Sequence, residues 1–304
     1  ELLRGPAVQR LLFRRQIALV DIDEGRTSTN SPATPAAMGP NVKLDPDVRT
    51  PDAYVFDVFR VSGGRRHTYC FHGPSADRFH ANARDLREVP WGSTNTWESQ
   101  YLKGFLCPDN RTAGTAPEVL DATWRVRREK GEIRAMRPVA NPDGTTTHQP
   151  QVVFTTGNTE ASTLGKNYDP ASPPKFTRLL LFGQEGARVM TGRWIASAPA
   201  IAFDCLYAQR EQLDESAPAA PAAPDPVVGQ EITPDPVTTN ADPGTLQSVF
   251  PAVIEMVAGE PVITAQRLLP IADNETDARA AAAVELTLRG GRTDICFADG
   301  RPER

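Results

Sequence analysis

The chain has 304 residues, enough for one large domain or two ordinary ones; 39% are hydrophobic and 23% charged, so it is neither disordered throughout nor fibrous. The net charge is −5 and no basic stripe dominates, which argues against nucleic-acid binding. The longest apolar runs, such as RLLLFG and IAFDCLYA, are too short to cross a bilayer, so we expect no membrane insertion. The sequence begins at Glu1 without Met or a signal peptide, and we expect it to be a fragment of a larger protein.

The first predicted elements are strands. Residues 14–23 read as a strand that ends in acidic turn residues, and bulky side chains alternate with others along residues 53–61. Gly63 and Gly64 come next, and glycine supplies the positive φ that a tight turn demands. A further strand-like run occupies residues 66–72, so we predict that the two runs form a β-hairpin.

Strand-like runs continue to the end of the chain, and no long amphipathic helix is predicted. Gly290 and Gly291 mark a second hairpin turn, between residues 282–288 and 293–298. The other runs lie at residues 122–129, 151–157, 176–183, 187–194, 200–211, 248–259 and 261–270. Many short strands with turn signals between them predict an all-β fold of stacked antiparallel sheets, a β-sandwich.

Two segments interrupt the strand pattern, at about residues 24–52 and 213–244. Both are rich in Pro, Ala, Thr and Asp, and proline cannot donate a hydrogen bond within a sheet. They could be linkers between domains. Because only about four strands come after Gly244, too few for an independent core, we predict loop insertions in a single β-sandwich-type domain over residues 1–304.

The histidines do not predict a metal site. His67 and His72 lie five residues apart, and on one strand such residues point to opposite faces. Zinc requires three or four converging ligands. The chain also lacks Gly-x-Ser-x-Gly and any phosphate-binding loop. We therefore predict no catalytic residue and no metal ligand in this chain.

The four cysteines are widely spaced, with no Cys-x-x-Cys, which argues against a thiolate metal site. Cys70, Cys205 and Cys296 lie in apolar strand-like runs, so we expect free, buried thiols that pack as small hydrophobic groups. A disulfide remains an alternative if the protein is exported.

An aromatic stretch at residues 91–105 offers a candidate sugar-binding surface. Trp91 and Trp97 could stack on sugar rings. The alternative is a loop that is attached to the core by its aromatic side chains.

Two parts of the sequence resemble heparinase II/III-like polysaccharide lyases. They are RRQIALVDIDE with AYVFDVFRVSGGRRHTYCFHG, and SVFPAVIEMVAGEPVITAQRLLPI with LRGGRTDICFA. The resemblance covers roughly residues 14–73 and 248–298, and the family combines an α/α toroid with a stacked β-sheet domain. It implies β-elimination on uronic-acid-containing glycans by general acid–base chemistry.

This sequence lacks the family's His-x-His, which would precede residue 14, so no catalytic or zinc-binding residue carries over. The resemblance thus implies a non-catalytic C-terminal portion without a cofactor of its own, zinc being possible in the missing upstream part. It also implies an acidic polysaccharide as partner and a periplasmic or extracellular bacterial location. Candidate substrate-binding residues are Arg65, His67, Trp91 and Trp97. The alternative is a stand-alone carbohydrate-binding or structural β-sandwich without lyase activity, and oligomeric state stays open.

Overall fold

The computed structural model describes residues 12–22, 53–88, 105–130, 132–155, 159–197, 200–211 and 246–301. The predicted insertions at about 24–52 and 213–244 lie outside the described residues, as do Trp91 and Trp97.

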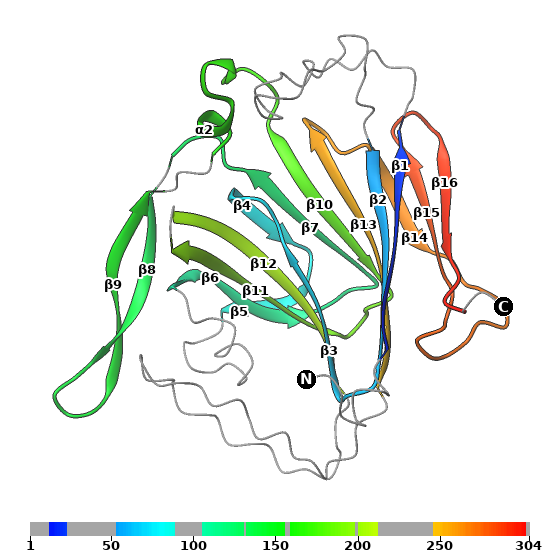
Figure 1. Cartoon of the computed structure of the whole chain (residues 1–304), viewed down its shortest axis with the longest axis horizontal. Helices are drawn as coiled ribbons and strands as arrows, with labels where there is room; N and C mark the ends of the chain where they lie inside the picture. Colours follow the sequence, from blue (N-terminus) through cyan, green and yellow to red (C-terminus); the bar gives the residue numbers. More distant parts are fainter. Residues whose placement is uncertain are drawn as a thin grey trace, which may run out of the picture.

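Within this part of the chain, six strands form a middle sheet in which all neighbours are antiparallel (Figure 1). In spatial order they are β1 (Leu12–Asp21), β2 (Ala53–Ser62), β13 (Gln247–Ala258), β10 (Lys175–Phe182), β7 (Val119–Val126) and β4 (Ala76–Ala81).

A large outer sheet covers one face of the middle sheet. Its strands are β3 (Arg66–His72), β12 (Ala200–Glu211), β11 (Arg188–Ser197), β6 (Phe105–Thr115), β8 (Glu132–Ala140) and β9 (Thr146–Thr155), with β5 (Arg84–Glu88) also paired to β6. The β8–β9 hairpin extends away from the stack in Figure 1, near the one-turn helix α2 (Glu160–Leu164) and the 3₁₀ turn Gly165–Asn167.

A small outer sheet covers the opposite face of the middle sheet. It is a meander of β14 (Ile263–Leu268), β15 (Ala282–Leu288) and β16 (Thr293–Ala298). The all-β prediction of stacked antiparallel sheets is therefore confirmed. So is the hairpin predicted at Gly290 and Gly291, where Gly291 has a φ of 86°.

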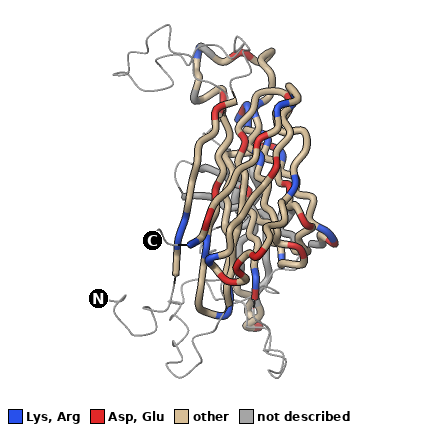
Figure 2. The backbone as a smooth tube through the Cα atoms, turned by 90° about the vertical axis from the view of Figure 1, so that its right-hand side faces the viewer, with Lys and Arg blue, Asp and Glu red and all other residues tan. Residues whose placement is uncertain are grey.

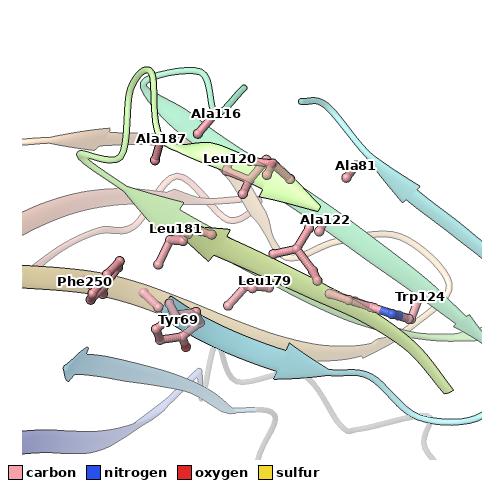
Figure 3. Packing of buried hydrophobic residues seen from close by; sticks show 14 of the residues in the cluster. Tyr69, Ala81, Ala116, Leu120, Ala122, Trp124, Leu179, Leu181, Ala187 and Phe250 are labelled. Carbon is pink, nitrogen blue, oxygen red and sulfur yellow. The ribbon is translucent and has the colours of Figure 1, made fainter. Parts of the chain in front are cut away.

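Burial on both faces explains the most apolar strand of the middle sheet. In β10, Leu179 and Leu181 pack toward the large outer sheet, and Leu180 and Phe182 pack toward the small one. All four side chains are fully buried. A strand covered on both faces loses the alternation of polar and apolar residues that marks a half-buried strand. Figure 3 shows the cluster between the middle and large outer sheets, which includes Trp124.

The predicted hairpin over residues 53–72 is wrong. β2 pairs with β1 and β13 in the middle sheet, whereas β3 pairs with β12 in the large outer sheet. The turn between them carries the chain from one layer to the next. Gly63 and Gly64 do adopt positive φ, at 88° and 82°. Residue alternation identifies a strand and glycines identify a turn, but neither says which strand becomes the neighbour.

The burial of the cysteines differs in part from expectation. Cys205 and Cys296 are buried free thiols, as predicted, but Cys70 is exposed. Cys70 lies on β3 and points away from the middle sheet, because Tyr69 on the same strand packs into the core. Its apolar sequence neighbours therefore do not bury it.

The surface of the described residues carries both signs of charge. Figure 2 shows Lys and Arg interspersed with Asp and Glu along the strands and their connections. Among the described residues, no helix combines the length and apolarity needed to cross a bilayer.

Candidate functional site

A cavity of about 360 Å³ lies where strand ends of the three sheets meet. This volume is at the lower end of the roughly 300–1,000 Å³ typical of small-molecule sites. Its apolar lining comes from β13, from the last residue of β14 and from the segment that follows: Val249, Pro251, Leu268, Leu269 and Ile271. Its polar lining includes Arg210, Gln247, Glu275, Thr276 and Asp277. A mainly apolar pocket with a few polar groups is the usual form of a ligand site.

Arg210 is the cation of this cavity. It lies near the end of β12, directly opposite His67 of β3, and its Nη2 donates a hydrogen bond to the carbonyl of Gly183 at 2.8 Å. That is its one hydrogen bond to a described residue. Burial lowers the pKa of Arg210, and no described carboxylate offsets this effect. A partly buried guanidinium without an acidic partner favours an anion from outside.

The acids on the cavity wall are already paired with another cation. Asp277 lies 2.8 Å and Glu275 3.7 Å from Nη2 of Arg279. The hydrogen bonds from Arg279 lower the pKa of Asp277, which keeps this carboxylate charged. Among the described residues, neither of these acids forms an ion pair with Arg210.

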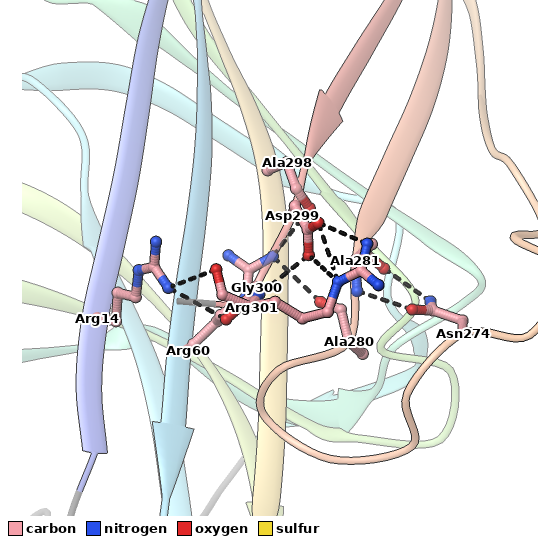
Figure 4. A network of polar contacts seen from close by, with 9 residues as sticks. All are labelled: Arg14, Arg60, Asn274, Ala280, Ala281, Ala298, Asp299, Gly300 and Arg301. Carbon is pink, nitrogen blue, oxygen red and sulfur yellow. Dashed lines mark hydrogen bonds and ion pairs between the residues drawn. The ribbon is translucent and has the colours of Figure 1, made fainter. Parts of the chain in front are cut away.

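Side-chain to backbone hydrogen bonds fix the outer wall of the cavity, residues 269–281. The Asn274 amide donates to the Ala281 carbonyl and accepts from the Ala281 N–H, both at 2.8 Å (Figure 4). Gln247 accepts a hydrogen bond from the N–H of Ala278. The wall is thus held in shape without a bound ligand, and a ligand would lose little entropy in ordering it.

His67 lies beside Arg210 but is enclosed. Only 4% of it is exposed, its Nε2 lies 2.6 Å from the Gly63 carbonyl, and its Nδ1 lies 2.8 Å from the Ser248 hydroxyl. A carbonyl can only accept, so Nε2 carries the proton and the Ser248 hydroxyl donates to Nδ1. Burial lowers the pKa of His67, and the charge of Arg210 lowers it further. The neutral His67 ring thus connects β3 of the large outer sheet to β13 of the middle sheet through its hydrogen bond with Ser248.

The other candidate substrate-binding residues are not brought into the cavity. Arg65 is exposed in the turn between β2 and β3 and is absent from the cavity lining. Trp91 and Trp97 lie outside the described residues. Glycan binding by Arg65, His67, Trp91 and Trp97 stays a prediction.

A second polar group, formed by Asp57, Arg15 and Tyr69, lies between the middle and large outer sheets. Arg15 donates from Nε and Nη2 to the buried Asp57 carboxylate, both at 2.7 Å, and the Tyr69 hydroxyl donates to it at 3.2 Å. Burial raises the pKa of Tyr69 far above its ordinary value. A tyrosine held protonated in this way is poorly suited to act as a general base.

Sequence reasoning did not single out Arg210. A signal was present, because Leu206, Ala208 and Arg210 share one face of β12 and the first two pack into the core. A cation that continues an inward-facing apolar row predicts a buried charge. The cavity wall formed by residues 269–281 could not be placed from sequence.

Among the described residues, no group of three or more His, Cys, Asp or Glu side chains is arranged to hold a metal ion. Comparison with known proteins found no matching family model, curated protein or solved structure.

Proposed function

We propose that the chain is the non-catalytic β-sheet portion of a heparinase II/III-like polysaccharide lyase, and that it binds an acidic glycan through Arg210. The observation that carries the binding part is the cavity-lining guanidinium that lacks a carboxylate partner among the described residues. Uronic acids supply a carboxylate, and arginine binds carboxylates with two parallel hydrogen bonds. A periplasmic or extracellular location belongs to the same proposal.

The arrangement of the strands supports the lyase part of the proposal. The two stretches that resemble the family, roughly 14–73 and 248–298, are far apart in sequence. In the structure, β1, β2 and β13 are consecutive neighbours in the middle sheet, and β14–β16 pack on them. The resemblance thus falls largely on one contiguous part of the molecule, which encloses most of the cavity lining.

Oligosaccharide titration tests the binding. We expect a tetramannuronate or a heparan tetrasaccharide to bind in calorimetry and neutral maltotetraose not to bind. Arg210→Gln should weaken binding about 10- to 100-fold, because a charged hydrogen bond contributes roughly 1.5–3 kcal/mol. The matched control is Arg267→Gln, which removes a 65% exposed arginine on the small outer sheet and should leave the affinity unchanged.

Two outcomes would contradict the binding proposal. One is equal weakening by both substitutions, which would indicate non-specific attraction to positive charge. The other is no binding of any acidic oligosaccharide at millimolar concentration, which would favour the alternative of a purely structural β-sandwich.

A further inference from the structure

β1 is an edge strand of the middle sheet. It is paired with β2 along its full length, from Leu12 opposite Ser62 to Asp21 opposite Ala53. Among the described strands, none pairs with its other side. A long edge strand presents unpaired N–H and C=O groups, which are a template for another strand.

The side chains of β1 make this edge more suitable for association. Phe13, Ile17 and Leu19 are 67%, 63% and 69% exposed. They share one face of the strand with Arg15 and Asp21, since successive side chains alternate between faces. The exposed face therefore carries an apolar row with a cation near one end and an acid at the other.

The order of these residues fits a second copy of the same strand. In a symmetric antiparallel pair centred on Ala18, Ile17 lies opposite Leu19 of the other copy, and Arg15 lies opposite Asp21. Each contact occurs twice because of the two-fold axis. Opposite charges and apolar pairs placed across two strands both stabilise a sheet.

Neighbouring registers are poorer. In a symmetric antiparallel pair, the two-fold axis must pass beside one residue of each strand and not between two residues, because only then do side chains of the same face lie opposite each other. A centre at Ile17 places Arg15 opposite Leu19 and Phe13 opposite Asp21. A centre at Gln16 places Arg15 opposite Ile17. Of these three registers, the one centred at Ala18 pairs both the opposite charges and the apolar side chains.

Arg15 can make the additional contact. Its Nε and Nη2 bind Asp57, while its side chain is 52% exposed and its Nη1 makes no hydrogen bond to a described residue. We propose that two copies of the chain associate through β1, in antiparallel pairing with Ala18 on the two-fold axis, to join their middle sheets into one. This inference is independent of the glycan-binding proposal.

The first test is the oligomeric state of the full chain. Light scattering coupled to size exclusion should give a dimer at about 50 μM. Asp21→Arg, which places two arginines opposite each other, and Leu19→Lys should each give a monomer with unchanged circular dichroism. The matched control, Phe297→Lys, alters a 57% exposed residue on the edge strand β16 and should stay dimeric.

The second test is the register. In a Cys70→Ser background, Ala18→Cys should form an intermolecular disulfide on mild oxidation with diamide, at least fivefold faster than Ile17→Cys. A monomeric parent chain would overturn the proposal, as would a dimer that survives both Asp21→Arg and Leu19→Lys. Faster cross-linking through Ile17→Cys would overturn the stated register.

Discussion

The two faces of the middle sheet are buried in different ways. Toward the large outer sheet, the contact is mainly aromatic and aliphatic: Trp124 packs on Phe71 and Phe79, with ring centroids 5.1 and 4.9 Å away. Toward the small outer sheet, the side chains are mostly aliphatic, and charged groups are buried among them.

Arg60 is the clearest example of a charged group buried between the middle and small outer sheets. It is fully buried, and it donates to the side chain of Gln16. It also donates to the carbonyls of Ala280 and Ala298 (Figure 4). Its guanidinium lies close to Gly300, where an added Cβ would be 2.6 Å from Nε. Burial lowers the pKa of Arg60, and the nearby charge of Arg14 adds to this effect.

Arg178 and Glu255 form another polar contact on this face. Arg178 donates to the Ile263 carbonyl, and Glu255 accepts from the Ile263 N–H at 3.0 Å. Both residues of the middle sheet therefore hold the first residue of β14. Tyr54 similarly donates to Asp294 of β16 at 2.8 Å.

The two outer layers thus depend on packing and on directed hydrogen bonds to different degrees. Rings dominate the contact with the large outer sheet, where Tyr69 and His67 are also hydrogen-bonded to Asp57 and Ser248 of the middle sheet. More polar groups connect the small outer sheet to the middle sheet, from Arg60, Arg178, Glu255 and Tyr54. When a packed side chain is truncated, the loss of stability grows with the volume removed. Directed bonds to buried charges are lost abruptly, when a partner is removed or its charge changes.

Trp124→Ala should give the largest effect, because Trp124 is the largest fully buried side chain of the described residues and packs between the middle and large outer sheets. Trp124 is fully buried, its Nε1 donates to the Asp204 carbonyl, and its ring lies against Gly73. We expect a loss of about 4 kcal/mol in the free energy of unfolding. Urea denaturation followed by circular dichroism measures it, with Phe297→Ala as a surface control. A loss below about 1 kcal/mol would contradict the packing account.

Arg60→Met should give a smaller and more local effect. The substitution removes the donor to the carbonyls of Ala280 and Ala298, and we expect a loss of about 2 kcal/mol in the free energy of unfolding. Because those carbonyls lie beside the small outer sheet, that sheet should open first. Cys296 is buried at this interface, 3.4 Å from the Tyr54 hydroxyl, and its labelling by a disulfide reagent should accelerate at least tenfold.

Cys205 provides the internal control for this experiment, since it is buried in the large outer sheet. Its labelling rate should change little in Arg60→Met. Equal acceleration at Cys205 and Cys296 would mean that the molecule opens as a whole and that the two interfaces are not separable.

Acid should give the smallest effect and should act on the small outer sheet. Hydrogen bonds from Arg292 lower the pKa of Asp294, and those from Arg301 lower the pKa of Asp299 to about 2. As pH falls below about 4, the unfolded chain takes up protons before the folded chain does. The stability from these carboxylates is present above that pH and is lost as pH falls toward 2.

Hydrogen exchange at pH 3 and pH 6, corrected for the intrinsic rates, measures the acid effect. Protection should fall more in β15 and β16 than in β7 and β10. An equal fall in all four strands would contradict the proposed difference between the interfaces.

The sequence located most of the long apolar strands but not their layers, and it did not predict β4, β5, β6 or β8. Alternation and flanking glycines located β2, β3, β15 and β16. The fully apolar run in β10 indicated burial without saying that two sheets cover it. The hairpin between β2 and β3 was wrong because the true neighbour of β2, β13, lies near the other end of the chain.

The candidate site was harder to predict, for the same reason. The cavity brings together residues from β12, β13 and the segment after β14, and no local pattern connects them. His67 was identified as a candidate from its residue type alone. Its enclosure by Gly63 and Ser248 depends on tertiary contacts, as does the lack of a described acidic partner at Arg210.

The pairing of β2 with β13 also has a consequence for how the chain folds. β2 comes from the first quarter of the sequence and β13 from the last, so the middle sheet closes only when almost the whole chain is present. Contacts of such high sequence separation slow folding. During synthesis, at roughly 5–20 residues per second, β1 and β2 are made long before β13, so their apolar side chains would stay exposed until β13 emerges. The topology therefore predicts slow closure of the middle sheet, whereas the meander of β14–β16 pairs strands that are consecutive in the sequence.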